Sequence, residues 1–162
     1  AFVILVLWLF EFFWLRLHAG LFISEFSDIR GVTYIFLGYA LFAFLVSLVR
    51  EIIKDMEDSE GDETYGCKTL PLVAGMKHTR YVVAVIIITT MMLLGYAHLI
   101  LYRLNLMMAF WYFLVTVQLA ALYLLTKLFR AHEKQDYHIL SNLCKLIMVA
   151  GILSMEVILI SN

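Results

Sequence analysis

Long apolar stretches make up most of the chain, and charged residues fall mainly in the segments between them. A helix that crosses the hydrocarbon of a bilayer needs about 20 mostly apolar residues. Five stretches reach or approach that length: 1–15, 32–49, 81–102, 106–126 and 143–160. Runs of this kind are apolar on every face, which a soluble helical bundle does not tolerate. The pattern therefore predicts an all-α, polytopic bundle of transmembrane helices.

The composition supports a membrane protein. Of the 162 residues, 64% are hydrophobic and 15% are charged, whereas a soluble domain has about 45–50% apolar and about 25% charged residues. The mean hydropathy is +0.91. A net charge of -1 gives no basic excess, so we expect no nucleic-acid partner. The bilayer itself is the expected surrounding.

The Lys and Arg residues between the predicted spans indicate an orientation. Segment 50–80 holds Arg50, Lys54, Lys68, Lys77 and Arg80, and segment 127–142 holds Lys127, Arg130 and Lys134. The intervening segments are poorer in basic residues. Because cytoplasmic loops carry an excess of Lys and Arg, 50–80 and 127–142 are predicted to be cytoplasmic loops of a cell (inner) membrane protein.

The polar side chains inside predicted spans include His98 and Gln118. Polar groups in hydrocarbon need hydrogen-bond partners, and neighbouring helices commonly supply them. We therefore expect both side chains to form hydrogen bonds between helices rather than to bind a ligand.

Seven of the 13 acidic residues lie between Glu51 and Glu63. If the helix of span 32–49 continues outward, Asp55, Asp58 and Asp62 share one face. Like charges at that spacing repel, so a bound cation is expected. Magnesium prefers oxygen ligands and completes its shell with water and phosphate. Glycines at 61 and 66 are expected to end the helix.

The acidic segment has other interpretations. A solvated charged face is the simplest. An EF-hand loop starting at Asp55 fails, because its sixth position is Glu60 and its twelfth is Gly66. A transporter or channel subunit with a regulatory cation site stays open as an alternative, although transporters more often break their spans with Gly or Pro near the midplane.

The segment also resembles a known family. The sequence R-E-x-x-K-D-x-E-D-x-E-G-D over 50–62, followed by G-x-K-T-L-P over 66–71, is similar to the second aspartate-rich motif of the UbiA superfamily of intramembrane prenyltransferases. The residues of this motif most resemble those of the geranylgeranylglycerol-phosphate geranylgeranyltransferase branch of the family. The resemblance implies a nine-helix fold, of which residues 1–162 would be the C-terminal part of one domain and the missing N-terminal half a partner.

The resemblance also implies a reaction. Family members transfer an isoprenoid from an allylic prenyl diphosphate, such as geranylgeranyl diphosphate, to a lipophilic acceptor, either an ether-lipid glycerol phosphate or an aromatic quinone precursor. Asp58 and Asp62 would be the catalytic magnesium ligands, with Asp55 as a third candidate. Candidate diphosphate contacts are Lys68, Lys54 and Arg50. The first aspartate-rich motif does not occur in this sequence, so we expect these 162 residues to be inactive by themselves.

Overall fold

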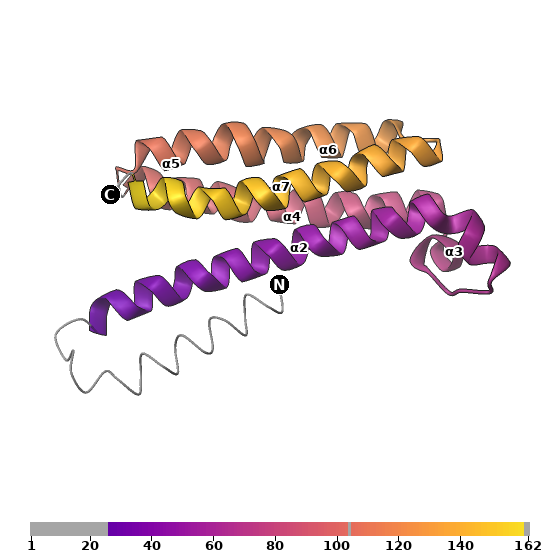
Figure 1. Cartoon of the computed structure of the whole chain (residues 1–162), viewed down its shortest axis with the longest axis horizontal. Helices are drawn as coiled ribbons and strands as arrows, with labels where there is room; N and C mark the ends of the chain where they lie inside the picture. The colour runs from indigo at the N-terminus through magenta and orange to yellow at the C-terminus, as the bar shows by residue number, and fades with distance from the viewer. Residues whose placement is uncertain (1–25, 104, 161–162) are drawn as a thin grey trace. The chain divides into compact units, whose positions relative to one another are not determined.

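The described part of the chain is helical, which confirms the predicted all-α class. The structure is a computed structural model that describes residues 26–103 and 105–160, with side chains for 37–103, 105–154 and 157. Its elements, shown in Figure 1, are α2 (Phe26–Thr64), α3 (Leu70–Ala74), α4 (Met76–Arg103), α5 (Met107–Tyr112), the π-helical η2 (Phe113–Gln118), α6 (Leu119–Arg130) and α7 (Lys134–Ile160). These described ranges contain no β-strand. The predicted span 1–15 lies outside them.

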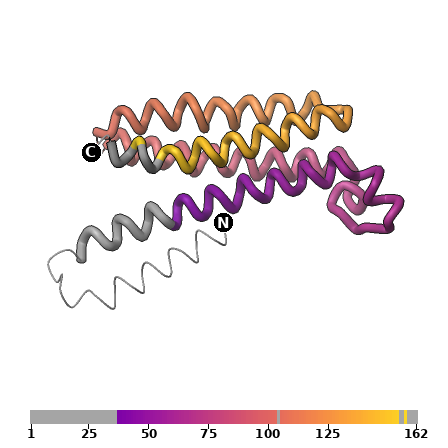
Figure 2. The backbone as a smooth tube through the Cα atoms, viewed as in Figure 1, coloured from indigo at the N-terminus to yellow at the C-terminus, as the bar shows by residue number. Residues whose placement is uncertain are grey.

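Three helical stretches of the described part are long and apolar enough to cross a membrane. They are Met76–Arg103, Met107–Arg130 and Lys134–Ser154. They correspond to the predicted spans 81–102, 106–126 and 143–160, and Figure 2 shows them as long tubes that run alongside one another. Each is longer at one or both ends than its apolar run, because helical hydrogen bonding continues into residues that are charged but are good helix formers.

The chain divides into two units, residues 1–44 and 45–162, and α2 belongs partly to each. In the first unit the described part is the start of α2, where Leu37, Leu41 and Phe44 are exposed. The predicted span 32–49 is helical throughout, as expected. Its role as a membrane span stays a prediction.

Within the second unit, the end of α2 contacts α7, and α4 and α7 both pack against α6. Val49, Ile53 and Met56 of α2 are buried, and so are Leu140 and Cys144 of α7.

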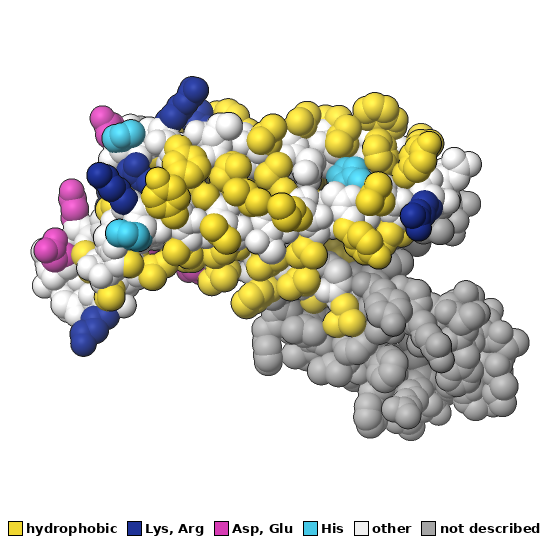
Figure 3. Space-filling view, turned by 180° about the vertical axis from the view of Figure 1, so that it is seen from behind, with side chains coloured by type: hydrophobic (Ala, Val, Ile, Leu, Met, Phe, Trp, Pro, Cys, Tyr) yellow, Lys and Arg dark blue, Asp and Glu magenta, His cyan; other side chains and the backbone are white. Residues whose placement is uncertain are grey.

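The outward faces of the helices are apolar as well. Large exposed side chains on α4 and α7 include Val85, Met92, Leu99, Leu146 and Leu153. On the face in Figure 3, apolar side chains cover the middle of the helices, and most charged ones gather at the end that carries α3. An exposed apolar surface of this extent suits contact with lipid rather than water.

Among the described residues, the hydrogen bonds between helices include one of the two that we expected. Gln118 donates from Nε2 to the Met91 carbonyl of α4 at 3.5 Å, and the Tyr112 hydroxyl donates to the Ala150 carbonyl of α7 at 3.0 Å. The expectation for His98 was wrong. Its Nδ1 lies 2.7 Å from the Leu94 carbonyl of its own helix, because a carbonyl four residues earlier is the nearest polar group in an apolar environment.

The predicted loops 50–80 and 127–142 are mostly helical, which corrects the sequence interpretation. Helix α2 runs through Gly61 and ends at Thr64, and Gly66, two residues beyond that end, has a φ of 69°. The Gly66 amide donates to the Glu63 carbonyl and the Cys67 amide to the Asp62 carbonyl, as in a Schellman cap. The second linker is only residues 131–133. Both linkers lie at the same end of the bundle (Figure 1), as their shared basic character indicated.

Candidate functional site

The acidic residues predicted as metal ligands lie on the last turns of α2, beyond its apolar part. Asp55, Asp58 and Asp62 are each neither fully buried nor fully exposed. The continuous helix keeps them on one face, as the spacing predicted. This face lies at the charged end of the second unit, next to the start of α7.

Asp58 contacts two lysines. Lys54 places Nζ 2.9 Å from Oδ2, and Lys134 of α7 places Nζ 3.7 Å from Oδ1. The hydrogen bond from Lys54 is the main cause that lowers the pKa of the Asp58 carboxyl, and the charge of Lys134 acts in the same direction. The same hydrogen bond raises the pKa of the Lys54 ammonium. Asp58 is therefore firmly ionised and already partly neutralised.

Asp55 has the opposite environment. Partial burial is the largest cause that raises the pKa of its carboxyl, and the neighbouring charges of Asp62, Glu51 and Asp58 add to it. The ionised form is thus disfavoured by like charges on the same helix face. This is the repulsion that the sequence predicted, and a cation placed between these carboxylates would relieve it.

Glu57 is a residue that the sequence interpretation did not single out. Its side chain is 6% exposed. Oε1 lies 3.0 Å from Nδ1 of His138 on α7 and 3.3 Å from Nζ of Lys54, while Oε2 is buried without a hydrogen-bond partner in the described structure. A signal was present in the sequence, because Glu57 falls on the apolar stripe of Val49, Ile53 and Met56, where a carboxylate needs partners.

The three predicted diphosphate contacts separate in the structure. Lys54 lies in the acidic site, as described above. Arg50 instead pairs with its neighbour Glu51. Lys68 is exposed between α2 and α3, and within the described ranges it forms no ion pair. Of these three cations, only Lys54 therefore forms an ion pair with a predicted metal ligand among the described residues.

A magnesium ion needs hard oxygen ligands. In the part of the chain that the structure describes, no three His, Cys, Asp or Glu side chains lie close enough together to hold a metal by themselves. Magnesium, however, is usually bound by one or two carboxylates, with water and substrate phosphate as the other ligands. Asp58 and Asp62 supply two carboxylates, which are hard oxygen donors. Their chemistry therefore fits a magnesium ion that is shared with a phosphate.

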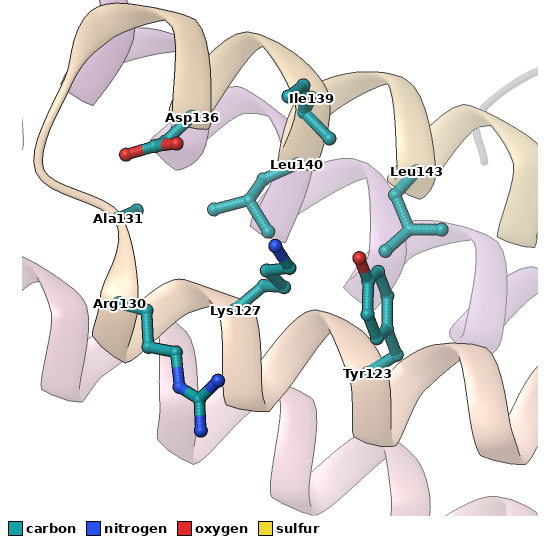
Figure 4. A pocket seen from close by; sticks show the side chains of 8 residues that line it. All are labelled: Tyr123, Lys127, Arg130, Ala131, Asp136, Ile139, Leu140 and Leu143. Carbon is teal, nitrogen blue, oxygen red and sulfur yellow. The ribbon is translucent and has the colours of Figure 1, made fainter.

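A pocket lies between α6 and α7 and is separate from the acidic residues (Figure 4). Its volume is about 60 Å³, and Lys127 Nζ lies 5.8 Å from the centre of the Tyr123 ring beside it. The residues that line it are Tyr123, Lys127, Arg130, Ala131, Asp136, Ile139, Leu140 and Leu143. None of them belongs to the acidic segment, and the volume is too small for an isoprenoid chain.

Comparison with known proteins gives a family. The model of the UbiA prenyltransferase family matches residues 8–143. A segment of 51 residues is 55% identical to the digeranylgeranylglyceryl phosphate synthase of Thermococcus kodakarensis, covering 32% of this chain and 18% of that protein. A segment of 62 residues is 40% identical to the enzyme of the same name from Methanothermobacter thermautotrophicus, covering 32% of this chain and 22% of that protein.

These matched segments thus span about a fifth of the curated relatives. No solved structure matches the chain. The apolar helices and the family match together show a multi-pass membrane protein. Because the family model covers most of its length, the chain belongs to the UbiA prenyltransferase family.

Proposed function

We propose that this protein carries out magnesium-dependent transfer of an isoprenoid group from an allylic prenyl diphosphate to a membrane-associated acceptor. The observation that carries the proposal is the placement of Asp58 and Asp62 on one helix face at the charged end of an apolar bundle, within a chain that matches the family model. A diphosphate needs that charged end, and an isoprenoid chain needs the apolar environment beside it.

The names of the relatives favour one acceptor class. The two relatives described above are both named digeranylgeranylglyceryl phosphate synthase, and they match this chain over about a fifth of their length. We therefore propose a geranylgeranyl diphosphate donor and a glycerol phosphate ether lipid as the acceptor, in preference to an aromatic quinone precursor.

The reaction breaks the bond between the allylic carbon and the diphosphate oxygen, and it forms a bond between that carbon and the acceptor oxygen. The acceptor hydroxyl loses its proton and diphosphate leaves. Magnesium, when bound, would offset the negative charge that grows on the leaving diphosphate. In this chain Asp58 and Asp62 would hold it, with Asp55 beside them.

This chain would also supply positive charge near the diphosphate and exclude water from the reacting carbon. The Lys54 ammonium would add positive charge beside the diphosphate, and Lys68 and Arg50 are further candidates for this role. Fixed charges of this kind lower the barrier when they favour the ionised leaving group over the ground state. The apolar helices keep water away from the allylic cation, which would otherwise be hydrolysed.

We further propose that this segment supplies one of two aspartate-rich half-sites, because the sequence holds only one such motif. On this view the nine-helix fold of the family is completed by an N-terminal half, and residues 1–162 alone show no turnover. The basic segments 50–80 and 127–142 would face the cytoplasm of the cell membrane.

The test uses the protein at its full natural length in membrane vesicles. The vesicles receive Mg²⁺, geranylgeranyl diphosphate and, in separate reactions, a glycerol phosphate ether lipid and an aromatic acceptor. Prenylated ether lipid and released diphosphate are expected. If no prenylated product forms and the vesicles instead pass divalent cations, the transporter or channel alternative is favoured.

A further inference from the structure

Asp58 lies between ammonium groups that come from two different helices. Lys54, one turn earlier on α2, faces Oδ2 at 2.9 Å, and Lys134, at the start of α7, faces Oδ1 at 3.7 Å. Each carboxylate oxygen therefore has its own cation. Lys134 follows Asp58 by 76 positions in sequence, so only the fold brings it to the site.

The next turn of α7 fixes the position of Lys134. His138 lies four residues after Lys134 and so on the same face of the helix. Its Nδ1 contacts Oε1 of Glu57 at 3.0 Å, and the Glu57 side chain is 6% exposed. A buried carboxylate is costly without its partners. The contact between Glu57 and His138 thus holds α7 against α2 and keeps Lys134 opposite Asp58.

This arrangement has a consequence for substrate binding. An oxygen of Asp58 that faces an ammonium cannot also bind a divalent cation closely, because the two cations repel each other. A diphosphate brings enough negative charge to receive the displaced ammonium. Lysine suits this exchange, since its compact charge sits on a flexible stem with three rotatable donors. The Lys134 side chain is 69% exposed and therefore free to turn.

We propose that Lys134 is a diphosphate-binding residue that α7 contributes to the site, and that it shifts from Asp58 to the substrate when a prenyl diphosphate binds. The substrate class rests on the proposed function above. Lys54 makes the same exchange from the α2 side. The diphosphate is then held between two helices, and Glu57 and His138 act as positioning residues for Lys134.

The experiment compares Lys134→Ala and Lys134→Arg in the full-length protein, with Lys77→Ala as the matched control. Lys77 is an exposed lysine near the start of α4, at the same end of the bundle. Two quantities are measured: KM for the prenyl diphosphate, and the affinity for inorganic diphosphate with Mg²⁺ by titration calorimetry. Lys134→Ala is expected to raise KM and weaken diphosphate binding by about tenfold, the effect of one charge-assisted hydrogen bond, with kcat little changed.

Lys134→Arg is expected to restore most of both quantities, and Lys77→Ala to leave them unchanged. Wild-type diphosphate affinity in Lys134→Ala would overturn the proposal even if prenyl transfer is confirmed. An equal loss in Lys77→Ala would also overturn it, because the effect would then be one of general surface charge. If the wild-type protein binds diphosphate but transfers no prenyl group, the proposed function fails while the role of Lys134 is still decided by calorimetry.

Discussion

His138 Nδ1 lies 3.0 Å from Glu57 Oε1, across 81 positions of sequence. This contact joins the last charged turns of α2 to the first turns of α7. It is the one described contact in which a buried carboxylate of the acidic segment meets another helix. Two helices that the sequence predicted independently are thereby fixed in register beside the proposed metal ligands.

Replacing His138 by Ala should destabilise the protein, because it leaves the buried Glu57 carboxylate with Lys54 as its remaining partner. The loss of such a bond costs about 1–3 kcal/mol, which should appear as a lower unfolding temperature in detergent. His78→Ala is the control, since His78 is exposed near the start of α4. Equal unfolding temperatures for the two variants would contradict the structural role given to His138.

The fold was largely predictable from the sequence, because uncharged runs of about 20 residues have few alternatives to transmembrane helices. The ends of the helices were not. Gly61 was expected to break α2, yet the helix passes through it to Thr64, and Gly66 belongs to the cap that follows. Glycine in a helix interior carries only a modest cost, which the hydrogen bonds of neighbouring turns outweigh, whereas the positive φ at Gly66 needs a residue without a side chain.

The candidate site was predictable only in part, because the sequence pattern describes a single helix and not the helices that pack against it. Periodicity along one helix places Asp55, Asp58 and Asp62 on one face without any knowledge of the fold. It says nothing of α7, so Lys134 and His138 could not be assigned to the site. Arg50 pairs with its sequence neighbour Glu51, and its role as a diphosphate contact stays a prediction.

The two glycines give a prediction with opposite signs. Gly61→Ala should stabilise α2 by about 0.5–1 kcal/mol, because an added Cβ meets no atom within 4 Å and Ala is the better helix former. Gly66→Ala should destabilise the protein by about 1 kcal/mol, since the residue has φ +69°. The check is the unfolding temperature of each variant in detergent. Changes of the same sign would show that the helix end is wrongly placed.

Asp55→Asn should stabilise the protein in the absence of Mg²⁺ and diphosphate. The pKa of Asp55 is raised in the folded state, so ionisation disfavours folding, and removing the charge relieves a like-charge repulsion of a few tenths of a kcal/mol. The gain should be present at neutral pH and vanish as pH falls below the ordinary carboxyl pKa of 3.8, where Asp55 is neutral in both states. Thermal unfolding at pH 7 and at low pH measures it.

The effect of Asp55→Asn on stability should also depend on bound Mg²⁺ and diphosphate. With Mg²⁺ and inorganic diphosphate present, the repulsion is already offset, so the advantage of Asp55→Asn should shrink. Glu60→Gln is the control, an exposed acid on the same helix. A stabilisation of Asp55→Asn that is unchanged by ligand would argue that Asp55 does not face the bound cation.

The most direct test of the central claim is the rate of prenyl transfer by Asp58→Asn and Asp62→Asn in the full-length protein, beside Glu60→Gln. Asn keeps the size of the side chain but removes the charge that a metal needs. Each Asp variant should lose about a hundredfold or more in kcat at saturating Mg²⁺, as when a group that stabilises transition-state charge is removed, while Glu60→Gln keeps nearly wild-type turnover. Near-normal turnover by Asp58→Asn and Asp62→Asn would contradict the assignment of these two residues as the metal ligands.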